Sequence, residues 1–166
     1  KIWNAFRFIE MQATNHDYQS RNGSSNILSD WMGSKIQHTS ENCKAHIKNY
    51  RFDLASEEIY ELVWSNFCDW YIEFNKVAIQ KSENSDQTNN LISNLIGNFY
   101  SILELLHPFM PFITEELSSK LASLAKKEKS GFLVQSGFAH TRPSNEKTEK
   151  QVDEIINIIS ALRVIR

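Results

Sequence analysis

The sequence predicts an all-α fold, a bundle of long helices joined by short connections. Apolar residues recur at three- and four-residue steps along most of the chain, which is the period of a helix with one buried face. Glycine and proline are scarce, with 5 and 3 copies in 166 residues, too few for the many tight turns of an all-β domain. No pattern of paired strands appears that could support a nucleotide-binding sheet.

The first two helices are separated by a polar loop. The first is expected over about residues 1–13, and its apolar stripe is formed by Ile2, Phe6, Ile9 and Ala13. The run Asn22-Gly23-Ser24-Ser25 then breaks the helical pattern. A second helix begins between Asn26 and Asp30. The side chains that it directs toward the core are Trp31, Ile36, Cys43 and Ile47.

The third helix is expected to be long and to end before the polar run at 81–88. Asp53 is a good N-cap for it, and Glu57 and Glu58 follow close to the positive end of the helix dipole. On a wheel with 100° per residue, one face is apolar and points to the core. Along its length the apolar positions are Leu54, Ile59, Leu62, Val63, Phe67, Trp70, Phe74 and Val77.

Prolines mark the next boundary. A fourth helix over about 89–106 ends near Pro108, because the residue before a proline is pushed out of the helical region. Pro111 suits the first turn of a fifth helix, which runs to about Lys127. Residues 130–145 are expected to be irregular, with a short extended segment at Phe132-Leu133-Val134, and a sixth helix begins near Glu146. We therefore expect a bundle over 1–129 and a linker with a last helix over 130–166.

Composition excludes several classes of protein. The net charge is −2, so no global basic surface points to nucleic acid, although residues 52–116 carry −9 between segments of +3 and +4. There is no glycine-rich phosphate loop, HExxH or GxSxG motif, so we expect no catalytic residue in this chain. Cys43 and His46 are spaced like metal ligands, but without a second pair we expect no metal site. No apolar run is long enough to span a membrane.

One aromatic side chain of the first helix lies off the apolar stripe. Lys1, Asn4 and Phe8 cluster on a different side of the wheel, at i, i+3 and i+7. One interpretation is that a second protein layer covers Phe8. The other is a stacking platform for an unpaired RNA base, with Lys1 on a phosphate and Asn4 on a base edge.

The third helix raises a similar choice at 69–76. Asp69, Glu73 and Lys76 share the face opposite Trp70, where a solvated strip of ion pairs is the simpler interpretation. Alternatively Glu73 is displayed with Ile72 beside it, and its carboxylate accepts a hydrogen bond from an exocyclic amine of a base.

Three segments, in this order and spacing, resemble the valyl-tRNA synthetase family. They are "KIWNAFRF" at 1–8, "FCDWYIEFNK" at 67–76 and "LLHPFMPFITEEL" at 105–117. The resemblance covers about residues 1–125 and is to the α-helical anticodon-binding domain that follows the catalytic core. Ser118 departs from the pattern, which has an aromatic residue there, and residues 126–166 match weakly.

The resemblance implies a function and a set of site residues. Lys1, Asn4, Phe8, Ile72 and Glu73 would contact the anticodon of tRNA(Val), and Arg7 and Lys76 would touch the RNA backbone. The chain would be a non-catalytic piece of a longer, cytoplasmic, monomeric ligase. Its catalytic domain, with the HIGH and KMSKS signatures that bind ATP with magnesium, would lie upstream in the same chain. No cofactor is expected in the piece itself.

Two alternatives stay open from sequence. The first is the anticodon-binding domain of a sister synthetase of the isoleucyl or leucyl type, since these families share the proline-rich corner loosely, although the "KIWNA" and "CDWYIE" segments are more specific to the valyl branch. A plain helical module that docks to protein is the second, and it would require Phe8, Ile72 and their neighbours to form a larger apolar patch.

Overall fold

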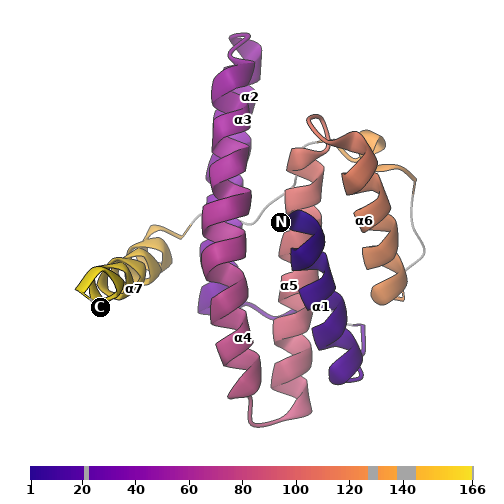
Figure 1. Cartoon of the computed structure of the whole chain (residues 1–166). Helices are drawn as coiled ribbons and strands as arrows, with labels where there is room; N and C mark the ends of the chain where they lie inside the picture. Colours follow the sequence, from indigo (N-terminus) through magenta and orange to yellow (C-terminus); the bar gives the residue numbers. More distant parts are fainter. Residues whose placement is uncertain (21–22, 127–130, 138–144, 166) are drawn as a thin grey trace.

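The fold is a bundle of helices, seen in a computed structural model that describes residues 1–20, 23–126, 131–137 and 145–165 (Figure 1). In those residues no strand is present, and the all-α prediction is confirmed. In chain order, the elements are α1 (Ile2–Asn15), α2 (Ile27–Lys48), α3 (Phe52–Glu61), η1 (Leu62–Tyr71), α4 (Ile72–Gln80), α5 (Ser85–Leu106), α6 (Pro111–Leu124), η2 (Leu133–Gln135) and α7 (Glu146–Ile165).

The helix starts show which local signals decide a boundary. Asn26 has an extended backbone, and its side-chain oxygen accepts a hydrogen bond from the Ser29 N–H at 2.8 Å, so α2 begins where the sequence predicts. Pro111 occupies the first turn of α6, also as predicted. The Asp53 prediction is wrong: Arg51 is the N-cap of α3, and the Asp53 carboxylate instead pairs with the Arg51 guanidinium at 2.7 Å.

Two further local predictions are wrong. The loop expected at 81–88 is shorter, because Asn84 caps α5 by accepting a hydrogen bond from the Gln87 N–H at 2.8 Å, and the helix starts at Ser85. Phe132 is extended, but the next three residues form the short 3-10 helix η2. Leu133 is buried there, and its N–H donates to the Glu115 carboxylate at 3.0 Å, which ties this segment to α6.

The predicted third helix forms as one continuous rod, but its middle is a π-helix. In η1 each hydrogen bond reaches back five residues, as when the N–H of Ile72 donates to the Phe67 carbonyl. The turn is therefore wider than in an α-helix, and a wheel drawn at 100° per residue assigns wrong faces. Tyr71 and Ile72 become buried, whereas Val77, predicted to be in the core, is 48% exposed.

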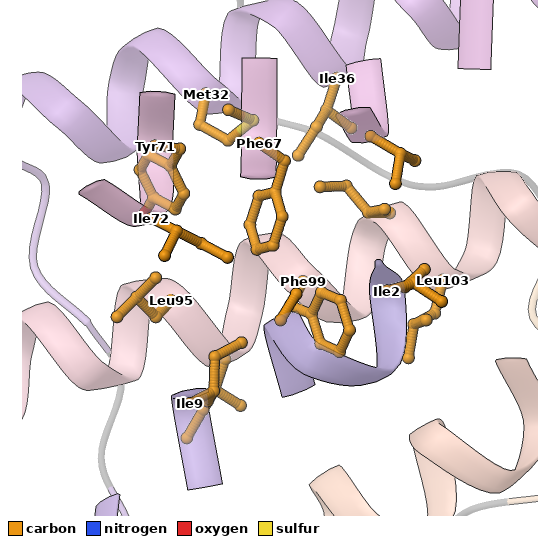
Figure 2. Close-up of a cluster of buried hydrophobic side chains, with 14 of the residues drawn as sticks. Ile2, Ile9, Met32, Ile36, Phe67, Tyr71, Ile72, Leu95, Phe99 and Leu103 are labelled. Carbon is orange, nitrogen blue, oxygen red and sulfur yellow. The ribbon is translucent and has the colours of Figure 1, made fainter. Parts of the chain in front are cut away.

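The core lies where α1, α2, η1 and α5 meet (Figure 2). Phe67 of η1 stacks on Phe99 of α5 with ring centroids 5.4 Å apart, and Ile9 of α1 approaches Leu95 from the other side. Burying each such side chain contributes on the order of 1.5–3 kcal/mol. The stripe of α1 that the sequence predicted is buried as expected, with Ala5 added to it.

The last helix contacts the outer face of α2 and η1. The Trp31 indole N–H donates to Asp153 at 3.0 Å, and the same carboxylate pairs with Lys35 at 2.9 Å. Arg163 lies 4.9 Å from the centroid of the Trp70 ring. Trp70 is accordingly half-buried between helices and does not enter the central core. The division of the chain at 129/130 stays a prediction.

Candidate nucleic-acid interface

The outer face of α1 carries a shallow hollow of about 640 Å³ that is largely open to solvent. Seven residues line it, all from this helix: Asn4, Arg7, Phe8, Glu10, Met11, Thr14 and Asn15. Three of these, Asn4, Arg7 and Phe8, are site residues that the sequence predicts. The opposite stripe of α1 is held against the core, which fixes the direction in which this face points.

Phe8 is the largest apolar side chain in this hollow. Its ring is half-buried, because one part packs against the edge of the core and the rest faces the hollow. Phe6, two residues before it, is 2% exposed and points into the core. Phe8 is thus held in place by packing while part of the ring stays accessible, which suits a stacking platform.

The polar lining of the hollow is nearly neutral. Arg7 and Glu10 are the charged residues in it, and Asn4 and Asn15 add two amides. The Thr14 hydroxyl donates to the Glu10 carbonyl at 2.9 Å, within the helix. Amides can donate and accept on a base edge, and a guanidinium can bind a phosphate or stack on a base. The hollow therefore offers the side chains needed to bind one nucleotide.

Lys1 does not line the hollow. Its ammonium donates to the Asp69 carboxylate at 2.6 Å and to the Trp64 carbonyl at 3.5 Å, both on η1. The hydrogen bond to Asp69 raises the pKa of Lys1, so the ion pair holds the start of α1 against the π-helix. Before Lys1 can bind a phosphate, its ammonium must leave Asp69 or share it.

Ile72 corrects the sequence prediction. It was expected on the surface beside Glu73, but it is only 8% exposed and points toward Leu95 and Ile9 in the core (Figure 2). The physical reason is the π-helix that precedes it, which turns Ile72 inward relative to an α-helical wheel. Ile72 is a core residue and offers no surface to a base.

Glu73 and Lys76 are exposed, as predicted, and their charged groups lie 3.8 Å apart. Neither lines the hollow on α1. Met11 and Asn15 do line it, and sequence reasoning missed them, although they continue the spacing of Asn4 and Phe8 by two more turns. Periodicity beyond residue 8 was the signal that would have found them.

Among the residues that the structure describes, no three His, Cys, Asp or Glu side chains gather as metal ligands would. No helix over the same residues is long and apolar enough to cross a membrane.

Comparison with known proteins identifies the class. The family described as the anticodon-binding domain of tRNA ligase matches residues 29–166, and the chain belongs to this family. The match begins after α1, so the hollow itself lies outside the matched residues.

The most similar relatives that we compared narrow the class of tRNA ligase to one amino acid. The chain is 34% identical to the valine--tRNA ligases of Coxiella burnetii and Francisella tularensis, over all of its length and 18% of theirs. It is also 34% identical to the valine--tRNA ligase of Aquifex aeolicus, over 15% of that protein. The chain thus spans less than a fifth of the length of these relatives, and these alignments do include α1.

Proposed function

We propose that this chain holds the anticodon of tRNA(Val) for a valine--tRNA ligase, and that the hollow on α1 is its contact with the anticodon. The observation that carries the proposal is the accessible Phe8 ring, which shares one hollow with Asn4 and Arg7. The family and the valine--tRNA ligase relatives support the choice of RNA and of valine.

In this proposal an unpaired base stacks on Phe8, the Asn4 amide bonds to its edge, and Arg7 binds the adjoining phosphate. Stacking on an aromatic ring and edge hydrogen bonds are how proteins recognise single-stranded RNA. Glu73 and Lys76 would contact the RNA outside the hollow, and Lys1 would bind a phosphate after leaving Asp69.

The chemistry would take place elsewhere in the intact protein. A catalytic domain upstream in the same chain would activate valine with ATP and magnesium and transfer it to the tRNA. The protein would act in the cytoplasm as a monomer. The near-neutral hollow makes few phosphate contacts, so we expect the chain alone to bind tRNA weakly, with a Kd in the high micromolar range, which corresponds to a binding free energy of roughly −4 to −5.5 kcal/mol.

The test is the Phe8→Ala variant, titrated at low salt with a hairpin RNA that carries the anticodon arm of tRNA(Val). Loss of one stacked base should weaken binding by about 1–3 kcal/mol, roughly 5- to 150-fold. Phe112→Ala is the matched control, because Phe112 is 92% exposed on α6 and lies outside the hollow. In the intact ligase, Phe8→Ala should leave valine-dependent pyrophosphate exchange unchanged.

A second hairpin RNA, with an isoleucine anticodon, tests whether the chain is specific for tRNA(Val) or for the tRNA of a sister synthetase. The wild-type chain should prefer the valine anticodon over an isoleucine anticodon in the same hairpin. Equal binding of both hairpins, or equal damage by Phe8→Ala and Phe112→Ala, would contradict the proposal.

A further inference from the structure

The tip of the α2–α3 hairpin carries a tyrosine in a backbone conformation that favours glycine. Tyr50 has φ of 57°, in the left-handed region. Its N–H donates to the Ile47 carbonyl at 3.0 Å, and the Arg51 N–H donates to the His46 carbonyl at 2.9 Å. This pair of bonds is the Schellman motif that ends many helices, and its left-handed residue is usually glycine.

Nothing in the packing of the tip explains the tyrosine. Its side chain is 83% exposed, so burial does little to offset the unfavourable backbone conformation. A side chain kept at a strained position without a packing role is a reason to look for a function.

The chemistry around Tyr50 is that of an RNA contact. Residues 44–52 include two lysines and an arginine and no carboxylate, in a chain of net charge −2. Phe52 is 55% exposed and lies two residues after Tyr50. Arg51 and the adjoining Asp53 pair at 2.7 Å and offset each other's charge, and Glu58 lies 4.0 Å from His46. The exposed Lys48 is then the cation that the tip offers. Exposed aromatics beside a lysine suit stacking together with phosphate binding.

The tip is far from the hollow on α1. In Figure 1 the hairpin projects beyond the ends of α5 and α6, whereas α1 packs alongside the lower part of α5. From its start to the tip, α2 has 22 residues and is about 33 Å long. A single ligand that contacts both places must span a comparable distance, and a folded RNA is long enough to do so.

We propose that Tyr50, Lys48 and Phe52 at the hairpin tip form a second contact with the same tRNA, on its sugar–phosphate backbone outside the anticodon arm. The choice of tRNA rests on the proposed function above. Tyr50 stacks on an unpaired base beside that backbone, while the Lys48 ammonium neutralises a phosphate.

The experiment titrates this chain at low salt with full-length tRNA(Val) and with the isolated anticodon-arm hairpin. The variants are Tyr50→Gly, Lys48→Ala and Phe8→Ala, and Asn49→Ala in the same turn is the control. We expect Tyr50→Gly to weaken binding of full-length tRNA about fivefold or more and to leave hairpin binding unchanged. The Tm of the Tyr50→Gly variant should rise, because glycine adopts the left-handed backbone conformation of this position without strain. Lys48→Ala should reduce the slope of the logarithm of the tRNA binding constant against the logarithm of the salt concentration by about 1, because one phosphate contact is lost.

The outcomes separate the two proposals. If Phe8→Ala has no effect while Tyr50→Gly weakens tRNA binding, the tip contact stands and the anticodon hollow fails. If Tyr50→Gly and Lys48→Ala both leave the tRNA affinity within twofold of wild type, the tip contact is overturned. It is also overturned if Tyr50→Gly weakens both RNAs equally, or lowers the Tm, because Tyr50 would then support the fold.

Discussion

Phe6 and Phe8 are chemically identical, lie two positions apart on α1, and have different roles. Phe6 is buried against the core, while Phe8 is part of the hollow on the outer face. Two residues correspond to about 200° around a helix, so one ring must point away from the core when the other points into it. The angle between these two positions, which follows from the sequence alone, therefore places Phe8 where it can contact RNA.

The two cysteines should differ in reactivity. Cys43 has no exposed surface, and burial raises its pKa from 9.0 to about 11, so little thiolate forms near neutral pH. The pKa of Cys68 is also raised by burial, but this residue is partly exposed. We expect iodoacetamide at pH 8 to alkylate Cys68 well before Cys43, as followed by peptide mass spectrometry. Equal rates in the folded protein would contradict the burial of Cys43.

The continuous helix from Phe52 to Gln80, formed by α3, η1 and α4, shows where a prediction from helical periodicity fails. The sequence predicts its length and its aromatic content, and both are right. It cannot predict that ten residues adopt π-helical hydrogen bonds, because that choice depends on how η1 packs against α2 and α5. A wheel drawn for an α-helix therefore places Ile72 on the surface and Val77 in the core, which is the reverse of what the structure shows.

Ile72 and Val77 provide a direct test of this shift. Ile72→Ala should lower the free energy of unfolding by about 2–4 kcal/mol, because it removes buried methylene groups from the core. Val77→Ala, at a site 48% exposed, should change it by less than about 0.5 kcal/mol. Urea denaturation measures both. Similar values for the two variants would mean that Ile72 is not a core residue.

The helix boundaries divide in a similar way. Asn26 and Pro111 act through their own side chain or ring, and both boundaries were predicted. Asp53 and Asn84 are both good caps in isolation, and only Asn84 acts as one. Asp53 pairs with Arg51 instead, and that interaction lowers its pKa to about 2. Competition between neighbouring partners decides such cases, and residue type alone does not reveal it.

Among the contacts that join α7 to the bundle is a carboxylate shared by two side chains of α2. The Asp153 carboxylate accepts hydrogen bonds from the indole N–H of the fully buried Trp31 and from the Lys35 ammonium. A residue of α7 thus pairs with two polar groups of α2. Val152 beside it is 2% exposed. These contacts give α7 a defined place on the bundle.

Asp153→Ala should loosen α7. The Trp31 N–H would lose its partner in a buried setting, which costs about 1–3 kcal/mol. We expect faster amide hydrogen exchange across 145–165 and a lower urea midpoint. Glu154→Ala, next to it but exposed, should have little effect on either measurement. If the two variants behave alike, the Asp153 contacts do not hold α7.

The helical class, most helix positions, the buried stripe of α1 and the outward direction of Asn4 and Phe8 could all be predicted from the sequence. They follow from local periodicity and from residues that act on their own backbone. The burial of Ile72, the ion pair of Lys1 with Asp69 and the left-handed backbone of Tyr50 could not. The Lys1 pair joins segments far apart in the chain. Ile72 and Tyr50 depend on backbone geometry, a π-helix and a Schellman turn, which the spacing of residues along an α-helix does not reveal.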